Sequence, residues 1–379
     1  MTLLSQHAKA CFQYAKATIP ELWSHLYHPY QQDEAIELAQ ANLRGRLTHN
    51  SGRLNFMMVV PVVNWEIALL DHAAAHGSCH HLSFESRAFF DSALEWKQYR
   101  ASNAEKLKRF FHDSYRPDDI NILFLYISEF HIDPEYLREF KQRNVIVIHF
   151  NWDDRLHYTS RHKGQSVGVR NVAKTVDFNL SMAVGPLSRY ATDGAAVFYW
   201  RGKSDTTSRE LALPKVEFNR VLFFGSRYGY RAELIDHLTR KGLPIDIYGS
   251  GWGTEFISYE SLIYKIPRYA LNLGVSTIGY TQSLSCVKGR DIEVPLSGGL
   301  YLTNQSREIE EVYVPGKEIL TYKSKDDCYR IACEVLNNPL IFSDIRRMGA
   351  MKAQSFSWEA RFEYLVELIQ SLSYSEIRS

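Results

Sequence analysis

Apolar residues along this chain follow two patterns, short continuous runs and runs spaced three or four residues apart. Continuous apolar runs are typical of strands that are buried on both faces of a parallel sheet. They occur at 54–60, 121–127, 145–150, 221–224, 245–248 and 300–303, and shorter strands are expected at 81–84 and 276–280. Helical spacing predicts helices at 134–143, 230–241 and 358–372. Strands that alternate with helices predict an α/β protein with parallel sheets.

The length of the chain and one polar stretch predict two domains. At 379 residues the chain is longer than one typical core. Residues 201–220, RGKSDTTSRELALPKVEFNR, are polar and contain a proline, which is typical of a linker. We expect two Rossmann-like domains that face each other across a cleft, where a ligand site is usual. We expect a helical extension at 1–50, a first domain at 51–207 and a linker at 208–220. A second domain is expected at 221–356 and a final helix at 357–379.

Composition narrows the class of protein. The formal net charge is +1 with basic and acidic residues interspersed, so we expect no nucleic-acid partner. The five cysteines form no CxxC pair, which argues against a disulfide framework and against structural zinc. No apolar run approaches the roughly 18 residues of a membrane span, and the first 20 residues lack a signal-peptide core. We therefore expect a cytoplasmic protein without a transmembrane segment.

The stretch 288–322 carries the most informative pattern of the chain. Its charged residues and glycine pair are Lys288, Arg290, Glu293, Gly298 and Gly299. A helix start, a glycine turn and a strand follow each other here, which places N–H groups and a carboxylate at one edge of an α/β sheet. Paired glycines allow a phosphate or a sugar to approach the backbone, and a glutamate can bind sugar hydroxyls. The stretch predicts a nucleotide-sugar site.

The same stretch resembles a known family. The order is Lys-x-Arg-x-x-Glu-x-Pro-x-x-Gly-Gly, then Gly316-Lys317-Glu318-Ile319, then a helix that ends at Asn338-Pro339. This order is similar to the donor-binding half of GT-B glycosyltransferases, and within them to the CgeB-like branch of the group 1 enzymes. The resemblance covers about residues 219–370. It implies a nucleotide-diphosphate sugar as donor and a donor site that needs no metal. It also implies that the final helix, 357–379, crosses back to the first domain.

Two glycine-rich turns extend the expected donor site. The first, residues 225–231, follows a strand and opens a helix, and its candidate residues are Gly225, Ser226, Arg227 and Arg231. Amides at that helix start and the two arginines suit a diphosphate, and the alternative is a turn with solvated arginines. The second, residues 249–253, holds Gly251 and Trp252 and corresponds to a loop that lines the nucleotide pocket in the resembling family. Its alternative is an ordinary loop packed on Trp252.

Glu293 matches the second carboxylate of the Glu-x7-Glu motif of the group 1 family, which the resemblance assigns to the nucleotide ribose. Ser285 occupies the first position of that motif, so the carboxylate that would contact the donor sugar is absent. Retention and inversion of the sugar therefore both stay open. The alternative for Glu293 is a solvated helix carboxylate, and for the Gly298-Gly299 pair it is a tight turn before a strand.

The first domain offers candidates for the acceptor side. Asp153 and Asp154 follow the strand at 145–150, and paired carboxylates raise one pKa toward that of a general base. The alternative is a helix cap with solvated acids. Further acceptor-side candidates are Asn64, Trp65, Glu66 and His157.

The sequence favours a hexosyltransferase-type enzyme that moves a sugar from a nucleotide-diphosphate sugar to a hydroxyl of a glycan, protein or small molecule. We expect no cofactor beyond the donor and no metal. Two alternatives remain: a sugar-nucleotide epimerase of the same fold, and a non-catalytic nucleotide-sugar-binding protein. The absence of a Gly-x-Ser-x-Gly elbow and of Gly-x-Gly-x-x-Gly after the first strand argues against a serine hydrolase and a nicotinamide enzyme.

Overall fold

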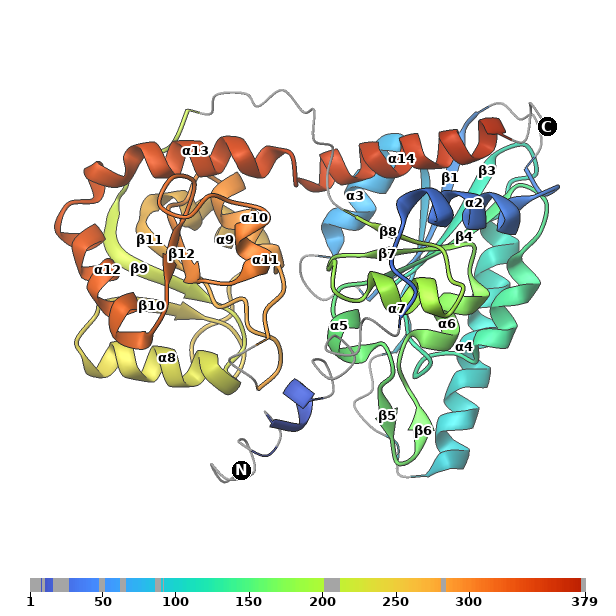
Figure 1. Cartoon of the computed structure of the whole chain (residues 1–379), viewed down its shortest axis with the longest axis horizontal. Helices are drawn as coiled ribbons and strands as arrows, with labels where there is room; N and C mark the ends of the chain where they lie inside the picture. The colour runs from blue at the N-terminus through green and yellow to red at the C-terminus, as the bar shows by residue number, and fades with distance from the viewer. Residues whose placement is uncertain are drawn as a thin grey trace. The chain divides into compact units, whose positions relative to one another are not determined.

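The computed structural model forms two compact units (Figure 1). We call residues 19–201 with 361–379 the N-terminal unit, and residues 1–18 with 202–360 the C-terminal unit. The structure describes residues 8, 11–15, 27–47, 52–61, 66–85, 90, 92–200, 212–280 and 284–375. Each unit contains one large parallel sheet with helices on its faces, so the predicted α/β fold with two Rossmann-like domains is confirmed.

The sheet of the N-terminal unit has six parallel strands in the order β2-β1-β3-β4-β7-β8. The strands are β1 Leu54–Val59, β2 Gly77–Leu82, β3 Ile120–Leu125, β4 Val145–Asn151, β7 Phe178–Ser181 and β8 Val197–Tyr199. The order reverses between β1 and β3, which gives the sheet a topological switch point. Strand β2 begins four residues earlier than the predicted 81–84, because it follows the preceding helix without a loop.

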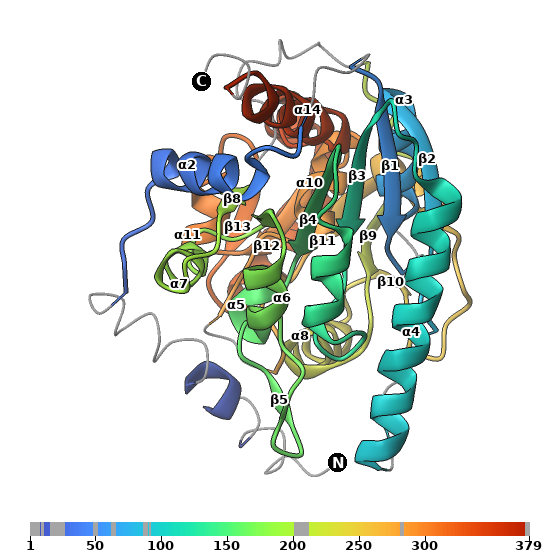
Figure 2. The same ribbon diagram turned by 90° about the vertical axis from the view of Figure 1, so that its right-hand side faces the viewer.

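Helices cover both faces of this sheet (Figure 2). They are α2 Gln32–Leu43, α3 Ile67–His76, α4 Ala93–Ser114, η2 Pro134–Phe140, α5 Asp154–His157, α6 Arg170–Thr175, α7 Leu187–Thr192 and α14 Trp358–Ser375, and a hairpin joins β5 Arg161–His162 to β6 Gln165–Ser166. Along β1, Met57 packs in the core beneath α4, while Phe56 points to the other face and meets Phe362 of α14. Alternate side chains of β1 thus serve opposite faces of the sheet.

The sheet of the C-terminal unit has five parallel strands in the order β10-β9-β11-β12-β13. The strands are β9 Phe218–Phe224, β10 Ile245–Tyr248, β11 Tyr269–Leu273, β12 Tyr301–Asn304 and β13 Leu320–Tyr322. The helices are α8 Gly229–Arg240, α9 Tyr259–Lys265, η3 Ile266–Arg268, α10 Gly289–Leu296, α11 Arg307–Glu310, α12 Lys325–Asn337, η4 Pro339–Phe342 and α13 Ser343–Gln354. The strand order reverses between β9 and β11, where α/β sheets bind ligands beyond the carboxyl ends of the strands.

Two sequence predictions for this unit were wrong in position. The strand expected at 276–280 is β11, Tyr269–Leu273, because Pro267 ends the preceding helical segment and all five strand residues are buried. Strand β9 begins at Phe218, whose ring lies 5.0 Å from that of Tyr269, so the last three residues of the expected linker 208–220 belong to the sheet. Residues 201–211 lie outside the described residues.

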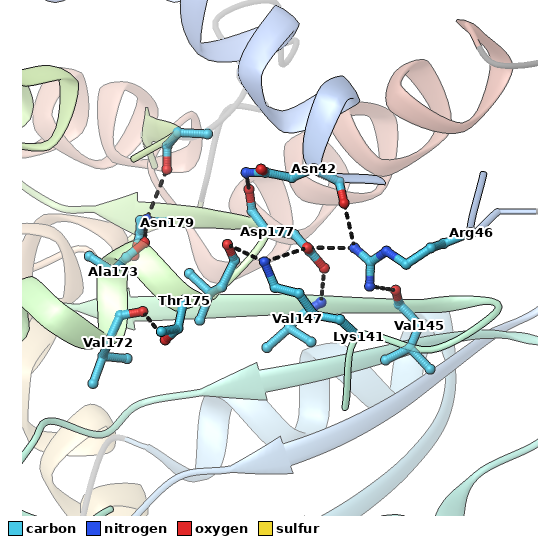
Figure 3. Close-up of polar contacts among 12 residues, drawn as sticks. Asn42, Arg46, Lys141, Val145, Val147, Val172, Ala173, Thr175, Asp177 and Asn179 are labelled. Atoms are coloured by element: carbon cyan, nitrogen blue, oxygen red, sulfur yellow. Dashed lines mark hydrogen bonds and ion pairs between the residues drawn. The ribbon is translucent and has the colours of Figure 1, made fainter. Parts of the chain in front are cut away.

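A buried ion network holds the amino ends of β4 and β7 (Figure 3). The carboxylate of Asp177, which is 0% exposed, lies 2.5 Å from Arg46 Nη2 and 3.3 Å from Lys141 Nζ. It also accepts a hydrogen bond of 2.8 Å from the Val147 N–H. Asn42 on α2 donates to the Asp177 carbonyl at 2.9 Å. The network fixes α2 and the segment that follows it to the sheet.

Arg346 on α13 has the corresponding position in the C-terminal unit. Its Nη2 donates to the carbonyls of Pro214 at 2.8 Å and Pro267 at 2.7 Å. Its Nε donates to the carbonyl of Gly298. These carbonyls precede β9, β11 and β12, so one guanidinium ties together the amino ends of the central strands.

Candidate functional site

Two interlocked glycine turns occupy the carboxyl ends of β9 and β10. Gly225 donates its N–H to the Tyr248 carbonyl at 2.9 Å, and its own carbonyl accepts from Trp252 Nε1 at 2.7 Å. Gly249 has φ +136°, and a Cβ added there would lie 2.5 Å from the Gly225 carbonyl oxygen. Only glycine permits this approach, so the sequence brings two backbone turns into contact. Ser226 extends the contact, because its hydroxyl accepts from Ser250 at 2.9 Å.

The same turn meets the loop after β11 at the switch point of the sheet. Gly229 begins α8, and a Cβ there would lie 2.9 Å from the Gly279 carbonyl oxygen. The amino end of α8 therefore lies beside the loop after β11, at the carboxyl end of β9. The amino end of a helix favours a negative charge.

Arg290 connects the start of α10 to the first glycine turn. Its Nη1 donates to the Phe224 carbonyl at 2.6 Å, and a Cβ on Gly225 would lie 2.9 Å from that nitrogen. The residue is 9% exposed. The structure thus shows an internal guanidinium that fixes the edge of β9.

The two arginines of the first turn differ in environment. Arg227 is half exposed, pairs with Asp236 at 3.0 Å and lies 5.4 Å from the ring of Trp252. A Cβ on Gly251 would lie 3.2 Å from Arg227 Cβ, so the two glycine-rich turns and Arg227 share one site. Arg231 is buried, and its guanidinium lies 4.4 Å from the ring of Tyr228.

Asp291 is a buried carboxyl that the sequence analysis missed. It accepts hydrogen bonds of 2.5 Å from the Lys288 N–H and from the Tyr301 hydroxyl. Burial raises the pKa of Asp291, and the hydrogen bonds and nearby cations oppose that rise. Its place in the first turn of α10, three residues after Lys288, is the capping position that could have revealed it.

Glu293 lies two residues further along α10. It accepts a hydrogen bond of 3.1 Å from the Tyr259 hydroxyl, and both groups are partly buried. Burial, and then the charge of Glu293, raises the pKa of Tyr259 above its ordinary value, so Tyr259 stays a donor. A Cβ on Gly289 would lie 3.3 Å from Glu293 Oε1, so this carboxylate reaches back to the amino end of α10. Glu293 is therefore oriented rather than simply solvated.

The prediction for Gly298 and Gly299 requires correction. Both lie at the amino end of β12, whereas the turns of Gly225 and Gly249 lie at carboxyl ends. The N–H of Gly298 donates to Pro295 at 2.8 Å, and that of Gly299 donates to Val294 at 2.9 Å. These amides close the end of α10, so they are not offered to a ligand. The alternative of a tight turn before the strand is the correct one.

Ser285, at the position where the resembling family has a carboxylate, belongs to a polar cluster. Its hydroxyl accepts from Asn304 Nδ2 at 3.2 Å, at the carboxyl end of β12. Asn304 Oδ1 in turn accepts from the Ser276 N–H at 2.7 Å. The amide of Asn304 and the hydroxyls of Ser276 and Ser285 therefore occupy the place where the resembling family has a carboxylate.

The carboxyl edge of the N-terminal unit presents the predicted aspartate pair. Asp154 is 0% exposed and accepts from the Tyr190 hydroxyl at 2.9 Å. Burial raises the pKa of Asp154 to about 7, and Asp153 is the last of the contributing causes. The expected rise is present, but desolvation rather than the neighbouring carboxylate causes it. Because Asp154 is buried, Asp153, which is partly exposed, is the member of the pair that reaches the surface.

The other acceptor-side candidates are scattered. His157 is exposed at the end of α5, and its Nδ1 lies 3.0 Å from the Ser160 hydroxyl. Glu66 is buried just before α3. Asn64 and Trp65 lie outside the described residues. Across the described part of the chain, no group of three or more His, Cys, Asp or Glu side chains is placed to hold a metal ion. No described helix is long and apolar enough to cross a membrane.

Comparison with known proteins places this geometry in context. Residues 230–367 match the model of a family described as glycosyl transferase-like. Among curated proteins, none has a sequence that matches this chain.

Solved structures share the fold at low sequence identity. Sucrose-phosphate synthase from Thermosynechococcus elongatus is similar with a TM-score of 0.59 and 10% identity, over 86% of this chain and 100% of that one. HepE from Anabaena, in complex with UDP and glucose, is similar with a TM-score of 0.54 and 12% identity, over 85% of this chain and 100% of that one. An alpha-glucosyltransferase in complex with UDP-glucose and DNA is similar with a TM-score of 0.52 and 10% identity, over 84% and 99%.

Proposed function

We propose that this chain, which has the GT-B fold and a glycosyl transferase-like domain over residues 230–367, transfers a sugar from a nucleotide-diphosphate sugar to a hydroxyl acceptor. One observation carries the proposal: the interlocked turns of Gly225 and Gly249 adjoin the amino end of α8 at the switch point of the sheet. This arrangement offers backbone amides without side-chain bulk. It suits a diphosphate that must approach the backbone closely.

The neighbouring side chains supply the remaining donor contacts. Arg227 and the amides of α8 would neutralise the diphosphate, with Lys288 as a further cation at the start of α10. Glu293, held by Tyr259, would accept hydrogen bonds from the ribose hydroxyls. Cations and amides would stabilise the leaving diphosphate by electrostatics, so the proposed reaction uses no metal and no cofactor beyond the donor. UDP in the HepE complex supports a uridine nucleotide as the first donor to test.

Asp153 is the proposed base if the reaction inverts the sugar. It is partly exposed, whereas Asp154 beside it is buried and bound to Tyr190. A base must reach the proton of the acceptor hydroxyl, which a fully buried carboxyl does not. Asp154 thus becomes a residue that positions the loop after β4. A hexose is the proposed transferred sugar.

The donor site is tested by binding. Isothermal titration of UDP, GDP and ADP without metal, each alone and as its glucose conjugate, should show binding of one nucleotide family. Glu293→Ala should weaken that binding about 10- to 100-fold, because a hydrogen bond to a charged group contributes about 1.5–3 kcal/mol. Glu334→Ala is the matched control, since Glu334 is exposed on α12 and pairs with Arg330. Equal affinities of the Glu293 variant and the wild type would refute the assignment.

The cluster of Ser285 and Asn304 supports a second candidate, a nucleotide-sugar-binding protein without transferase activity. A serine hydroxyl that already accepts from Asn304 replaces the carboxylate expected at the donor sugar. Release of free nucleotide from the donor distinguishes the two functions. Release that depends on an acceptor and falls strongly in Asp153→Asn supports the transferase, whereas tight binding without any release supports the binding protein. Conversion of the donor to its epimer would instead indicate the third possibility, an epimerase.

A further inference from the structure

A small pocket at the carboxyl edge of the N-terminal unit belongs to none of the groups described above. It has a volume of about 110 Å³, and it is lined by Phe90, Ser92, Ala93, Trp96, Phe130, His162, Lys163, Gln165 and Val167. These residues come from the segments that follow β2, β3 and β4, and the first turn of α4 forms part of the wall. Both views show the β5–β6 hairpin and the start of α4 at the lower end of this unit (Figures 1 and 2).

The wall of the pocket is aromatic and fixed in place. Trp96, 7% exposed, donates from Nε1 to the Phe130 carbonyl at 2.8 Å. The rings of Phe90 and Phe130 lie 5.3 Å apart, and Tyr99 packs 5.0 Å from Phe90 while its hydroxyl bonds the Glu85 carbonyl. An aromatic wall of this kind provides a large contact area to a ring at little cost in conformational entropy.

The rim of the pocket is cationic. Lys163 stands at the tip of the hairpin with φ +48°, and its ammonium group donates to the Phe90 carbonyl at 3.4 Å. Residues 155–176 contain five Lys or Arg residues and no Asp or Glu. Among the described residues, no ion pair joins Lys163 or Arg161 of the hairpin to a carboxylate. The hairpin therefore keeps positive charge at the mouth of an aromatic pocket.

We propose that this pocket binds a ring that carries a negative charge, a phosphate or a carboxylate, as the recognition group of the acceptor. Its volume is well below the roughly 300 Å³ of pockets for drug-sized ligands, so it accepts one ring and not an oligosaccharide. Trp96, Phe90 and Phe130 contact the ring, and Lys163 contacts the anion. The identification of the occupant as acceptor rests on the proposed transferase function. The existence of the pocket and its preference for an anionic ring are independent of that function.

The experiment uses the full chain and small probes. Phenyl phosphate, benzoate and the uncharged benzyl alcohol are titrated by saturation-transfer-difference NMR, and the two anions distinguish phosphate from carboxylate. We expect at least one of the two anions to bind. Benzyl alcohol should bind at least about fivefold more weakly than that anion. Lys163→Asn should weaken the anion about fivefold to tenfold, because it removes one charge-assisted contact at a position whose backbone suits asparagine. Lys174→Asn makes the same change on α6 at an exposed position outside the pocket, and it should bind as the wild type does.

Failure of this inference is separable from failure of the proposed function. Absence of anion binding, or equal loss in the Lys163 and Lys174 variants, overturns the pocket assignment even when UDP binds. Anion binding that depends on Lys163, in a protein that binds no nucleotide, keeps the pocket and refutes the transferase. When both bind, addition of phenyl phosphate at saturating donor should slow transfer by competition with the acceptor. Uncompetitive or absent inhibition would overturn the acceptor role.

Discussion

The two sheets of this protein are fixed at their amino ends by similar devices but differ at their carboxyl ends. An arginine from outside the sheet ties the amino ends together in each unit, Arg46 in the N-terminal unit and Arg346 in the C-terminal unit. Arg46 is neutralised by the buried Asp177, whereas Arg346 donates to backbone carbonyls of three segments. Burial lowers the pKa of Arg346, which is the cost of a guanidinium without a carboxylate partner.

At the carboxyl ends the C-terminal unit presents backbone and the N-terminal unit presents side chains. The turns of Gly225 and Gly249 bring backbone amides and carbonyls to the edge of β9 and β10, with the Arg227 side chain beside them. The edge of the N-terminal unit carries Asp153 and the pocket around Trp96. A backbone surface suits a group common to many substrates, such as a diphosphate, while a surface of side chains recognises one particular substrate. Amino ends should therefore govern stability, and carboxyl ends should govern binding.

The largest test of this comparison is Asp177→Asn. The change leaves Arg46 and Lys141 in a buried site without their counter-charge, and removal of one partner from a buried ion pair typically costs about 3–5 kcal/mol. Urea unfolding should show that loss in the transition of the N-terminal unit. Glu135→Gln, which breaks the exposed pair with Arg138, should cost less than about 1 kcal/mol.

Binding distinguishes this result from a general loss of structure. Under conditions where the Asp177 variant is folded, UDP should bind as tightly as it does to the wild type. A fold-stable Asp177 variant with weakened nucleotide binding would show that the amino and carboxyl ends are not independent.

The next test addresses the backbone edge through Gly249→Ala. A Cβ at Gly249 would collide with the Gly225 carbonyl at 2.5 Å in a backbone conformation of φ +136°. We expect the two turns to separate and nucleotide affinity to fall about 100-fold, equivalent to about 2.7 kcal/mol. Gly253→Ala is the control, because Gly253 also has positive φ, at +74°, but a Cβ there meets nothing within 4 Å. It should cost about 1 kcal/mol of stability and leave affinity unchanged. Similar affinities in the two variants would show that the contact between the turns is unimportant for the nucleotide.

The sequence predicted the sheets because their strands are continuous apolar runs, such as β1 and β4, whose burial on both faces leaves a local signature. The predicted position of a strand was wrong where that signature is weak. Strand β11 contains Asn272, which is fully buried and bonds the Ile266 carbonyl, so the run of residues that identifies a strand is interrupted. Gly298 was misassigned because a glycine pair occurs both in turns that bind a ligand and in turns that end a helix. Only the position at the amino end of β12 decides between them.

The least predictable parts of the sites depend on contacts between distant segments. Asp154 meets Tyr190, 36 residues away, and the aromatic pocket gathers Phe90, Phe130 and the hairpin from three separate segments. The residues in these contacts are not spaced at a helix or strand period, so the hydrophobic pattern of the sequence does not predict the contacts. The glycine turns of the proposed donor site were easier to locate, because a glycine turn that follows a strand and begins a helix is a local pattern.

The smallest test concerns the pH dependence that Asp154 gives to the N-terminal unit. Burial raises the pKa of Asp154 to about 7 in the folded protein, above its ordinary value of about 3.8. Between these values the folded state holds a proton that the unfolded state has released, so this carboxyl lowers stability as pH rises from about 4 to 7. Asp154→Asn replaces this carboxyl by an amide that is neutral at every pH, so it removes this pH dependence of the unfolding free energy. Its unfolding free energy relative to the wild type should therefore increase by on the order of 2 kcal/mol between pH 5.5 and 7.5. Asp153→Asn, at the partly exposed neighbour, should show no such trend, and a parallel pH dependence of all three proteins would mean that Asp154 ionises normally.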